Sequence, residues 1–296
     1  MYCKIDKIFN EEERNLKFLK LVSSLIIAGA LLITPMYSHA VNSKNLAVHY
    51  IDVGQGDSIY IKTPNGEDIL IDGGNKDGSD VVSYLKKQKV NDIELMIATH
   101  PDADHIGGLD EVLKAFKVKS VYAPKVSHTT EAYKDFLNAV KAEKVKIQSA
   151  KSGVDLKIKG LTAKFVAPVK EYGKDLNNWS AVLYITYGKN TFLFTGDAEE
   201  QSEKDMLNSK QSLKADVLKV GHHGAKETTT DAFLNAVQPK YAVISVGAKN
   251  SYKHPTNEVL NRLNKVKATV YRTDKHGSII ISSDGKKITV KTEKKG

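Results

Sequence analysis

The chain has 296 residues, with 44 Lys and Arg against 35 Asp and Glu, and a formal net charge of +9. With 41% hydrophobic and 27% charged residues, it is too apolar for a disordered chain and too polar for a protein of many membrane spans. The length suits one large domain or two small ones, and the basic charge suits either a polyanionic partner or an ordinary lysine-rich surface.

The first forty residues differ in composition from the rest. A basic flank ends at Lys17 and Lys20, an apolar run follows over 21–33, and Ser38-His39-Ala40 puts small residues at −3 and −1. This pattern predicts a secretory signal peptide over residues 1–40, which would engage the secretion machinery and yield a secreted, extracellular protein. Because the basic segment is long, an uncleaved anchor at the outer face of the cytoplasmic membrane is the alternative.

Cys3 is the only cysteine, and it lies in this leader. The remainder therefore has neither a disulfide nor a thiolate ligand. Any metal site must use His, Asp, Glu or Asn.

Beyond residue 41, short β-branched runs alternate with helical patterns, and Pro64-Asn65-Gly66 is a hairpin turn. The predicted strands cover 48–53, 58–62, 68–72, 93–99, 161–166, 182–186, 191–195, 216–220, 241–246, 268–272, 278–282 and 287–291. The predicted helices cover 79–89, 199–207, 231–237 and 256–263. Hairpins mixed with helices in both halves predict two sheets packed face to face with helices outside, a single α/β domain of four layers over 41–296.

The densest group of polar residues follows the strand predicted over 93–99. Four candidate ligands lie within six residues and precede a helix: His100, Asp102, Asp104 and His105. His100 and Asp102 can face one cation, while Asp104 and His105, past the turn, can reach a second. Such crowding of carboxylates and imidazoles is costly unless cations neutralise it. A metal site is therefore predicted in preference to a solvated loop with helix-capping Asp residues.

This stretch resembles the His-x-His-x-Asp-His motif of the metallo-β-lactamase superfamily, with Asp in place of the second His. It is similar, more narrowly, to the hydrolase domain of the competence protein ComEC family, in which the Asp form is usual. Other matching motifs occur in order at 51–58, 70–74, 194–198, 220–224 and 252–255. The resemblance implies a four-layer αββα metallo-β-lactamase sandwich and a metal-dependent hydrolase with two divalent metal ions, Zn or Mn.

The resemblance also implies roles for single residues. Asp197 would bridge both ions, and His222 would be a ligand of the second ion. His223 and His254 would be catalytic, the first in proton transfer or phosphate contact and the second in touching substrate. Asp72 would orient a ligand His. The choice between the adjacent His222 and His223 as ligand stays open, as do a helix cap for Asp197, a turn role for Asp72 and a surface role for His254.

One departure from the superfamily pattern concerns the first metal. Where a third His is usual, this chain has Asn177-Asn178-Trp179-Ser180. Asn offers only a neutral carbonyl oxygen, so the first site is richer in oxygen and poorer in nitrogen. Manganese or magnesium then becomes more plausible there than zinc, and occupancy of this site is left open.

Together these patterns predict an exported phosphodiesterase or nuclease in which metal-activated water cuts DNA or another polyanionic phosphodiester. Two alternatives remain: an esterase of another class, such as a phosphocholine esterase, lactonase or thioesterase, or a non-catalytic module that binds DNA or cell wall. The sequence leaves the oligomeric state open.

We expect the mature protein to begin at Val41, because the apolar run and the Ser38-His39-Ala40 site together specify cleavage there. N-terminal sequencing of protein from the culture supernatant or wall fraction tests this. An intact leader recovered in the membrane fraction would instead show a signal anchor.

Overall fold

The computed structural model describes residues 45–75 and 77–296. The predicted signal peptide over 1–40, with Cys3, lies outside the described residues. The described residues belong to one compact unit. Within the described ranges, none of the helices combines the length and the apolar character needed to cross a bilayer.

The first sheet has eight strands within the described ranges. In sheet order they are β17 (Ile288–Thr292), β16 (Ile279–Ser283), β1 (Leu46–Tyr50), β2 (Ile59–Lys62), β3 (Asp68–Ile71), β5 (Leu95–Ile97), β7 (Val121–Ala123) and β8 (Ile147–Ser149). The pairs from β17 to β3 are antiparallel, and those from β3 to β8 are parallel.

The second sheet has the same division into a parallel and an antiparallel half. In sheet order its strands are β15 (Thr269–Arg272), β14 (Tyr241–Ile244), β13 (Val217–Lys219), β12 (Asn190–Phe194), β11 (Val182–Tyr187), β10 (Thr162–Ala167) and β9 (Asp155–Leu156). The pairs from β15 to β12 are parallel, and the rest are antiparallel. A short parallel pair, β4 (Asp92–Ile93) and β6 (Lys117–Val118), lies apart from both sheets.

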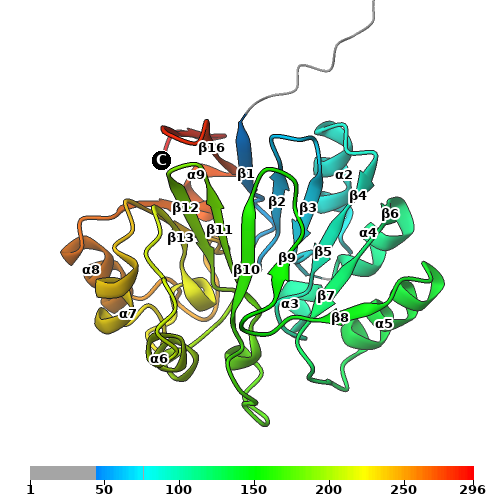
Figure 1. Cartoon of the computed structure of the whole chain (residues 1–296), viewed down its shortest axis with the longest axis horizontal. Coiled ribbons are helices and arrows are strands. Elements are labelled where there is room, and N and C mark those ends of the chain that lie inside the picture. Colours follow the sequence, from blue (N-terminus) through cyan, green and yellow to red (C-terminus); the bar gives the residue numbers. More distant parts are fainter. Residues whose placement is uncertain (1–44, 76) are drawn as a thin grey trace, which may run out of the picture. The chain divides into compact units, whose positions relative to one another are not determined.

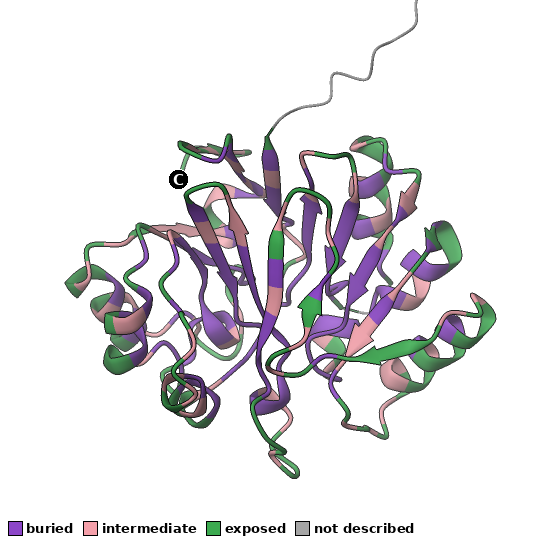
Figure 2. Ribbon diagram, viewed as in Figure 1, coloured by how far each residue is buried: buried purple, intermediate pink, exposed green. Residues whose placement is uncertain are grey.

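The two sheets pack face to face around a central apolar core that contains Phe165, Phe192 and Phe194 (Figures 1 and 2). A second core lies under α2 (Ser79–Lys87), α4 (Leu109–Ala115) and α5 (Glu131–Ala142) on the first sheet. A third lies under α6 (Glu200–Asn208), α7 (Asp231–Val237) and α8 (Asn257–Lys265) on the second sheet. Burial of each large apolar side chain contributes about 2–3 kcal/mol. The predicted αββα sandwich is confirmed.

Each predicted strand and helix is present with somewhat shifted ends, except that the strand predicted over 93–99 is divided between β4 and β5, and the predicted hairpin closes with Gly66 N donating to Thr63 O. Residues 51–53 were expected to continue the first strand, but β1 ends at Tyr50, and beyond it Ile51 N donates to Ser58 O and Asp52 N to the Ser278 side chain. The helix predicted to follow the ligand-rich stretch is α4, but no element was predicted between 116 and 160, where α5 and β6 to β9 lie, and α9 (Thr273–His276) was also missed.

Loops at the carboxyl ends of parallel strands meet at one edge of both sheets. Asp72 follows β3, His100 follows β5, Asp197 follows β12 and His222 follows β13. Sites in α/β proteins form at such edges because several strand ends deliver side chains to one place. The fold thereby brings together motifs that are far apart in the sequence.

The segment after β1 lies directly against the short helix α3 (Ala103–Ile106), which carries Asp104, since Asp57 N donates to Asp104 O at 3.1 Å. Gly56 has φ +143°, and a Cβ there would collide with the backbone oxygen of Asp104. Gly54 has φ +73° but faces open space. Substituting each glycine by alanine therefore distinguishes the cost of a positive φ alone, at Gly54, from that cost together with a steric clash, at Gly56.

We predict that Gly56→Ala destabilises the fold by at least about 2 kcal/mol and weakens metal binding, because the Asp104 backbone must move. Gly54→Ala should cost only about 1 kcal/mol, the penalty for a positive φ. Urea unfolding and metal titration of both variants test this. Equal losses in the two variants would mean that the contact with Asp104 is unimportant.

Candidate metal centre

His100 stands on the loop between β5 and α3 (Ala103–Ile106), His105 lies within α3, and both are fully buried. Their rings are 4.2 Å apart between centroids. Asp102 is the residue before α3, and its Oδ2 lies 3.6 Å from His100 Nε2. Three of the predicted ligands therefore point into one region.

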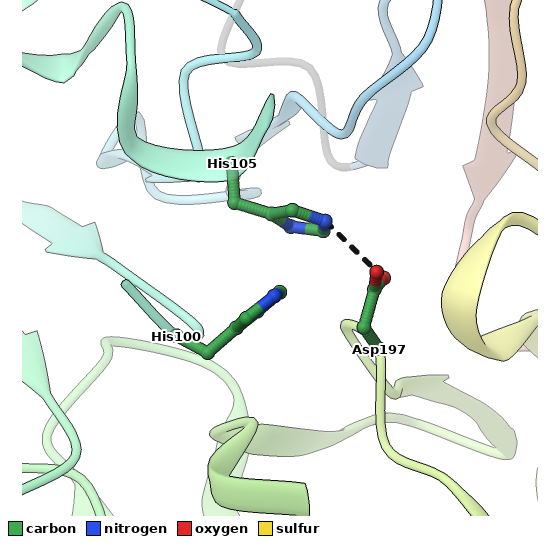
Figure 3. Close-up of side chains that lie close together, drawn as sticks. All are labelled: His100, His105 and Asp197. Atoms are coloured by element: carbon green, nitrogen blue, oxygen red, sulfur yellow. Dashed lines mark ion pairs between the residues drawn. The ribbon is translucent and has the colours of Figure 1, made fainter. Parts of the chain in front are cut away.

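Asp197 reaches this region from the second sheet, just after β12. Its Oδ1 lies 3.2 Å from His105 Nε2, and Figure 3 shows the two imidazoles and the carboxylate directed toward one another. Its backbone N–H donates to Ser180 Oγ at 3.0 Å, while Glu199, not Asp197, is the residue before α6. The side chain of Asp197 is thus not used as a helix cap.

The atoms that face the centre of this group lack hydrogen-bond partners. His100 Nε2, His105 Nε2 and Asp197 Oδ1 are buried and make no hydrogen bond, although the last two form an ion pair at 3.2 Å, and a set of ligand atoms from these three residues lies within 4.8 Å of one another. Buried polar atoms are normally paired, and leaving one unpaired costs about 1–3 kcal/mol. Two imidazole nitrogens and a carboxylate oxygen so arranged fit a divalent metal ion.

A second group shares His105 and adds Asp104 and His223. His223 Nε2 lies 3.1 Å from Asp104 Oδ2 and 3.5 Å from Asp197 Oδ2. The two groups meet at His105 and Asp197, so the arrangement can hold one or two cations.

His222 lies beside the cluster and is partly exposed. Its Nδ1 lies 2.9 Å from Glu199 Oε1, and its Nε2 is 3.7 Å from Asp197 Oδ2. The ring of His254 stands 5.5 Å from that of His222, edge to face. The structure thus brings all the predicted site residues together, but with His223 on the inside and His222 nearer to solvent. The individual roles of these histidines remain predictions.

Asp72 contacts His105 at the ring nitrogen that faces away from the centre of the cluster. Its carboxylate accepts hydrogen bonds from Thr99 N and Thr99 Oγ1 at 2.8 and 2.6 Å and lies 2.8 Å from His105 Nδ1. That contact leaves Nε2 of His105 to face the centre, as expected of a residue that orients a ligand His. Asp72 adopts φ 58°, a costly conformation that these bonds stabilise.

Two supporting residues were missed by the sequence analysis, Asp57 and Lys219. Lys219 is fully buried on β13, and its Nζ lies 2.9 Å from Asp57 Oδ2. Asp57 Oδ1 lies 3.4 Å from His223 Nδ1. A lysine inside the apolar run that forms β13 was the available signal, because a buried lysine requires a partner.

Asn178 is committed to structure rather than to a metal. Its carbonyl oxygen accepts from Glu199 N and Ser202 N at the start of α6, and its amide donates to Asp175 at 2.6 Å. Asn177 donates its amide to Glu199. Of the pair, Asn178 therefore has no carbonyl lone pair aimed at the cluster in this geometry.

The charges in the cluster are strongly coupled. Burial disfavours the imidazolium of His223, but the charges of Asp197, Asp104 and Asp57 outweigh it and raise its pKa to about 10. Burial likewise opposes ionisation of Asp104, yet His105 and His223 lower its pKa to about 2. The surplus of carboxylates attracts positive charge, and a metal would bind in competition with protons.

The sequence comparison agrees with this geometry: residues 51–248 match the metallo-beta-lactamase superfamily. The chain belongs to this superfamily, whose members are typified by metal-dependent hydrolysis.

Two curated relatives are competence or recombination proteins. ComE operon protein 3 of Bacillus subtilis is 34% identical over 87% of this chain and 36% of its own length. Recombination protein 2 of Haemophilus influenzae is 32% identical over 79% of this chain and 28% of its own length. The chain thus spans about a third of these relatives, and the resemblance to competence proteins is confirmed for that part.

Among solved structures, the metallo-beta-lactamase fold protein YhfI from Bacillus subtilis aligns with a TM-score of 0.54 and 14% identity. The match covers 81% of this chain and 99% of that one. At this identity the similarity establishes the fold.

We predict that Asp197→Ala and His105→Ala lose bound metal while keeping the fold, because both remove atoms from the centre and neither belongs to the apolar core. Metal content after dialysis, with circular dichroism as the folding check, measures this. Asp155→Ala, at an exposed position on β9, is the matched control. Full metal content in Asp197→Ala would assign that residue a purely structural role.

Proposed function

We propose that this chain is an exported phosphodiesterase that uses divalent metal ions to hydrolyse a polyanion such as DNA. The observation that carries the proposal is the set of buried ligand atoms without hydrogen bonds on His100, His105 and Asp197. A non-catalytic binding module has no need of such a set. Membership of a superfamily of metal-dependent hydrolases supports the same reading.

The ligand assignment starts from the two groups described above, gives their shared His105 to the second ion and adds Asp102, whose Oδ2 lies 3.6 Å from His100 Nε2, to the first. His100, Asp102 and Asp197 would hold the first ion, and Asp104, His105, Asp197 and His223 the second. Placing His223 among the ligands exchanges the roles expected for the adjacent histidines, and the 3.1 Å approach of His223 to Asp104 supports this exchange. When bound, the metal would activate a water molecule and neutralise the charge that develops on the phosphoryl oxygens.

His222 is then the candidate for proton transfer. Its contact with Glu199 fixes Nδ1 and leaves Nε2 facing Asp197 and the open side of the cluster. Burial lowers the pKa of His222, but Glu199 and Asp197 outweigh it and hold the pKa above its usual value. A protonated imidazole at this position can deliver a proton to the departing alkoxide.

His254 would touch the substrate. Its ring lies next to that of His222, and its Nδ1 is buried without a hydrogen-bond partner. Its pKa is lowered by burial and by the neighbouring His222 and His223, which favours the neutral ring. A neutral imidazole can still donate one hydrogen bond to a phosphoryl oxygen.

The choice of DNA and the location outside the cell rest on other observations. The net charge of +9 favours a polyanion, and the curated relatives include competence and recombination proteins. The basic, apolar and small-residue pattern of residues 1–40 supports export. Hydrolysis of oligonucleotides compared with carboxylic esters and lactones separates the proposal from the esterase alternative.

We expect greater phosphodiester hydrolysis with manganese than with zinc alone, because oxygen ligands dominate the first site and Asn178 supplies no further donor. Chelator-treated protein titrated with each ion, with His105→Ala as the inactive reference, measures this. Full activity with zinc and none with manganese would contradict the expectation. A nitrogen ligand from His222 would then complete the first site, and His222→Ala would lose that zinc.

A further inference from the structure

Tyr252 is the most exposed of the large apolar side chains in the described part of the chain. It is 66% exposed, whereas the other exposed ones, Leu137, Ile147 and Val169, lie between 36% and 39%. An exposed aromatic ring of this size lacks the stabilisation that burial gives to such rings elsewhere in the fold. The residues around Tyr252 indicate that a ligand could cover it.

The exposed ring continues a line of rings that leads to the metal centre. Tyr252 stacks on His254 with centroids 5.8 Å apart and an angle of 26° between the planes. His254 in turn meets His222 edge to face, and His222 Nε2 lies 3.7 Å from Asp197 Oδ2. One face of Tyr252 is therefore supported by His254 beside the reacting centre.

The loop that carries Tyr252 is tied to the turn that carries the two histidines. Asn250 donates to Gly247 O and His254 O, and its Oδ1 accepts from His254 N, which closes the loop. Thr256 N and Thr256 Oγ1 both donate to Gly224 O, at 2.9 and 3.1 Å. The ring is thus presented by an ordered loop held at a fixed place relative to His222 and His223.

The charge around the ring is positive. Lys249 and Lys253 flank Tyr252 on the same loop and are exposed. Within residues 45–75 and 77–296, neither lysine has an ion-pair partner. An exposed aromatic face with adjacent cations is the combination that binds single-stranded nucleic acid, because each base offers a π-face and each phosphate a negative charge.

We propose that Tyr252 forms a base-stacking subsite that holds one nucleobase of a single-stranded polynucleotide beside the scissile phosphate. This rests on the proposed phosphodiesterase function and narrows its substrate class. Bases in duplex DNA are already stacked on their neighbours, so the subsite favours single strands and frayed ends. Lys249 and Lys253 would contact the phosphates on either side of that nucleotide.

The test combines a change in the protein with a change in the substrate. Short oligothymidylates are prepared with a single abasic nucleotide at successive positions. On the intact strand, Tyr252→Ala should lower kcat/KM by about 5- to 100-fold, mainly through KM, the range known for loss of one base–aromatic stack. Tyr252→Trp should retain activity, since the indole also stacks.

The decisive result is non-additivity. At one abasic position, kcat/KM of the wild-type protein should fall by the same factor as kcat/KM of Tyr252→Ala falls on the intact strand. Tyr252→Ala acting on that abasic strand should lose little more, because the substitution and the missing base remove the same contact. Additive losses at all positions would overturn the proposal, as would a Tyr252→Ala protein as active as the control Leu137→Ala, at an exposed apolar position on α5.

Failure of this proposal is distinguishable from failure of the proposed function. If the wild-type protein hydrolyses strands and Tyr252→Ala does so equally well, only the stacking subsite is wrong. If no diester is hydrolysed with any metal, the proposed function is wrong, and fluorescence anisotropy of the same labelled strands tests stacking. In that measurement, the same non-additive loss of affinity supports the subsite, and equal binding of intact and abasic strands refutes it.

Discussion

Asp197 is a buried carboxylate between the two sheets, and its negative charge must be matched by positive charge. Burial alone would raise its pKa, but His105 and His223 hold it well below its usual range. Those imidazoles are in turn oriented through Nδ1, His105 by the Asp72 carboxylate and His223 by the Ser245 carbonyl oxygen at 2.9 Å, with the Asp57 carboxylate 3.4 Å from His223 Nδ1. The centre is therefore a network of charges and hydrogen bonds: burying Asp197 is favourable only because the imidazoles are near it, and the imidazoles are held by their own partners.

The last member of this network, counted from Asp197 through His223 and Asp57, is Lys219, which lies in the apolar core. Lys219 is buried beneath the site and pairs with Asp57, and its Nζ also donates to Val220 O at 2.7 Å. Breaking such a buried pair by removing one partner typically costs about 3–5 kcal/mol, so loss of either Asp57 or Lys219 would strongly destabilise the fold. A rigid support of this kind holds ligand atoms in place before any metal arrives.

Much of the fold and site could be predicted from the sequence because both rest on local patterns. The alternation of β-branched strands with helices gave the four layers, and four ligands within six residues gave the centre. The middle of the first half was harder. All three residues of β8 are exposed, so it carries no alternation, and its place depends on pairing with β7. Helix α5 did offer a signal in the helical spacing of Phe136, Ala139 and Val140.

The inward position of His223 could not be predicted, because adjacent residues differ only in how the backbone directs them. Here both His222 and His223 adopt positive φ, at 42° and 51°, which turns the second ring toward Asp104. The partner of Lys219 was equally hidden, since Asp57 lies in the connection between β1 and β2 of the other sheet and only packing brings the two together. Tertiary contact, not local preference, decides such details.

The origin of the ligands in two different sheets has a thermodynamic consequence. His100 and His105 come from the first sheet, and Asp197 and His223 come from the second, so neither half of the chain alone can assemble the centre. A cation that binds only the assembled centre would stabilise the folded state, in which the two sheets are packed together. By mass action, each tenfold rise in free metal above the dissociation constant adds about 1.4 kcal/mol to the free energy of unfolding. The resistance of this protein to heat is thus set by the metal concentration of its surroundings as well as by its core.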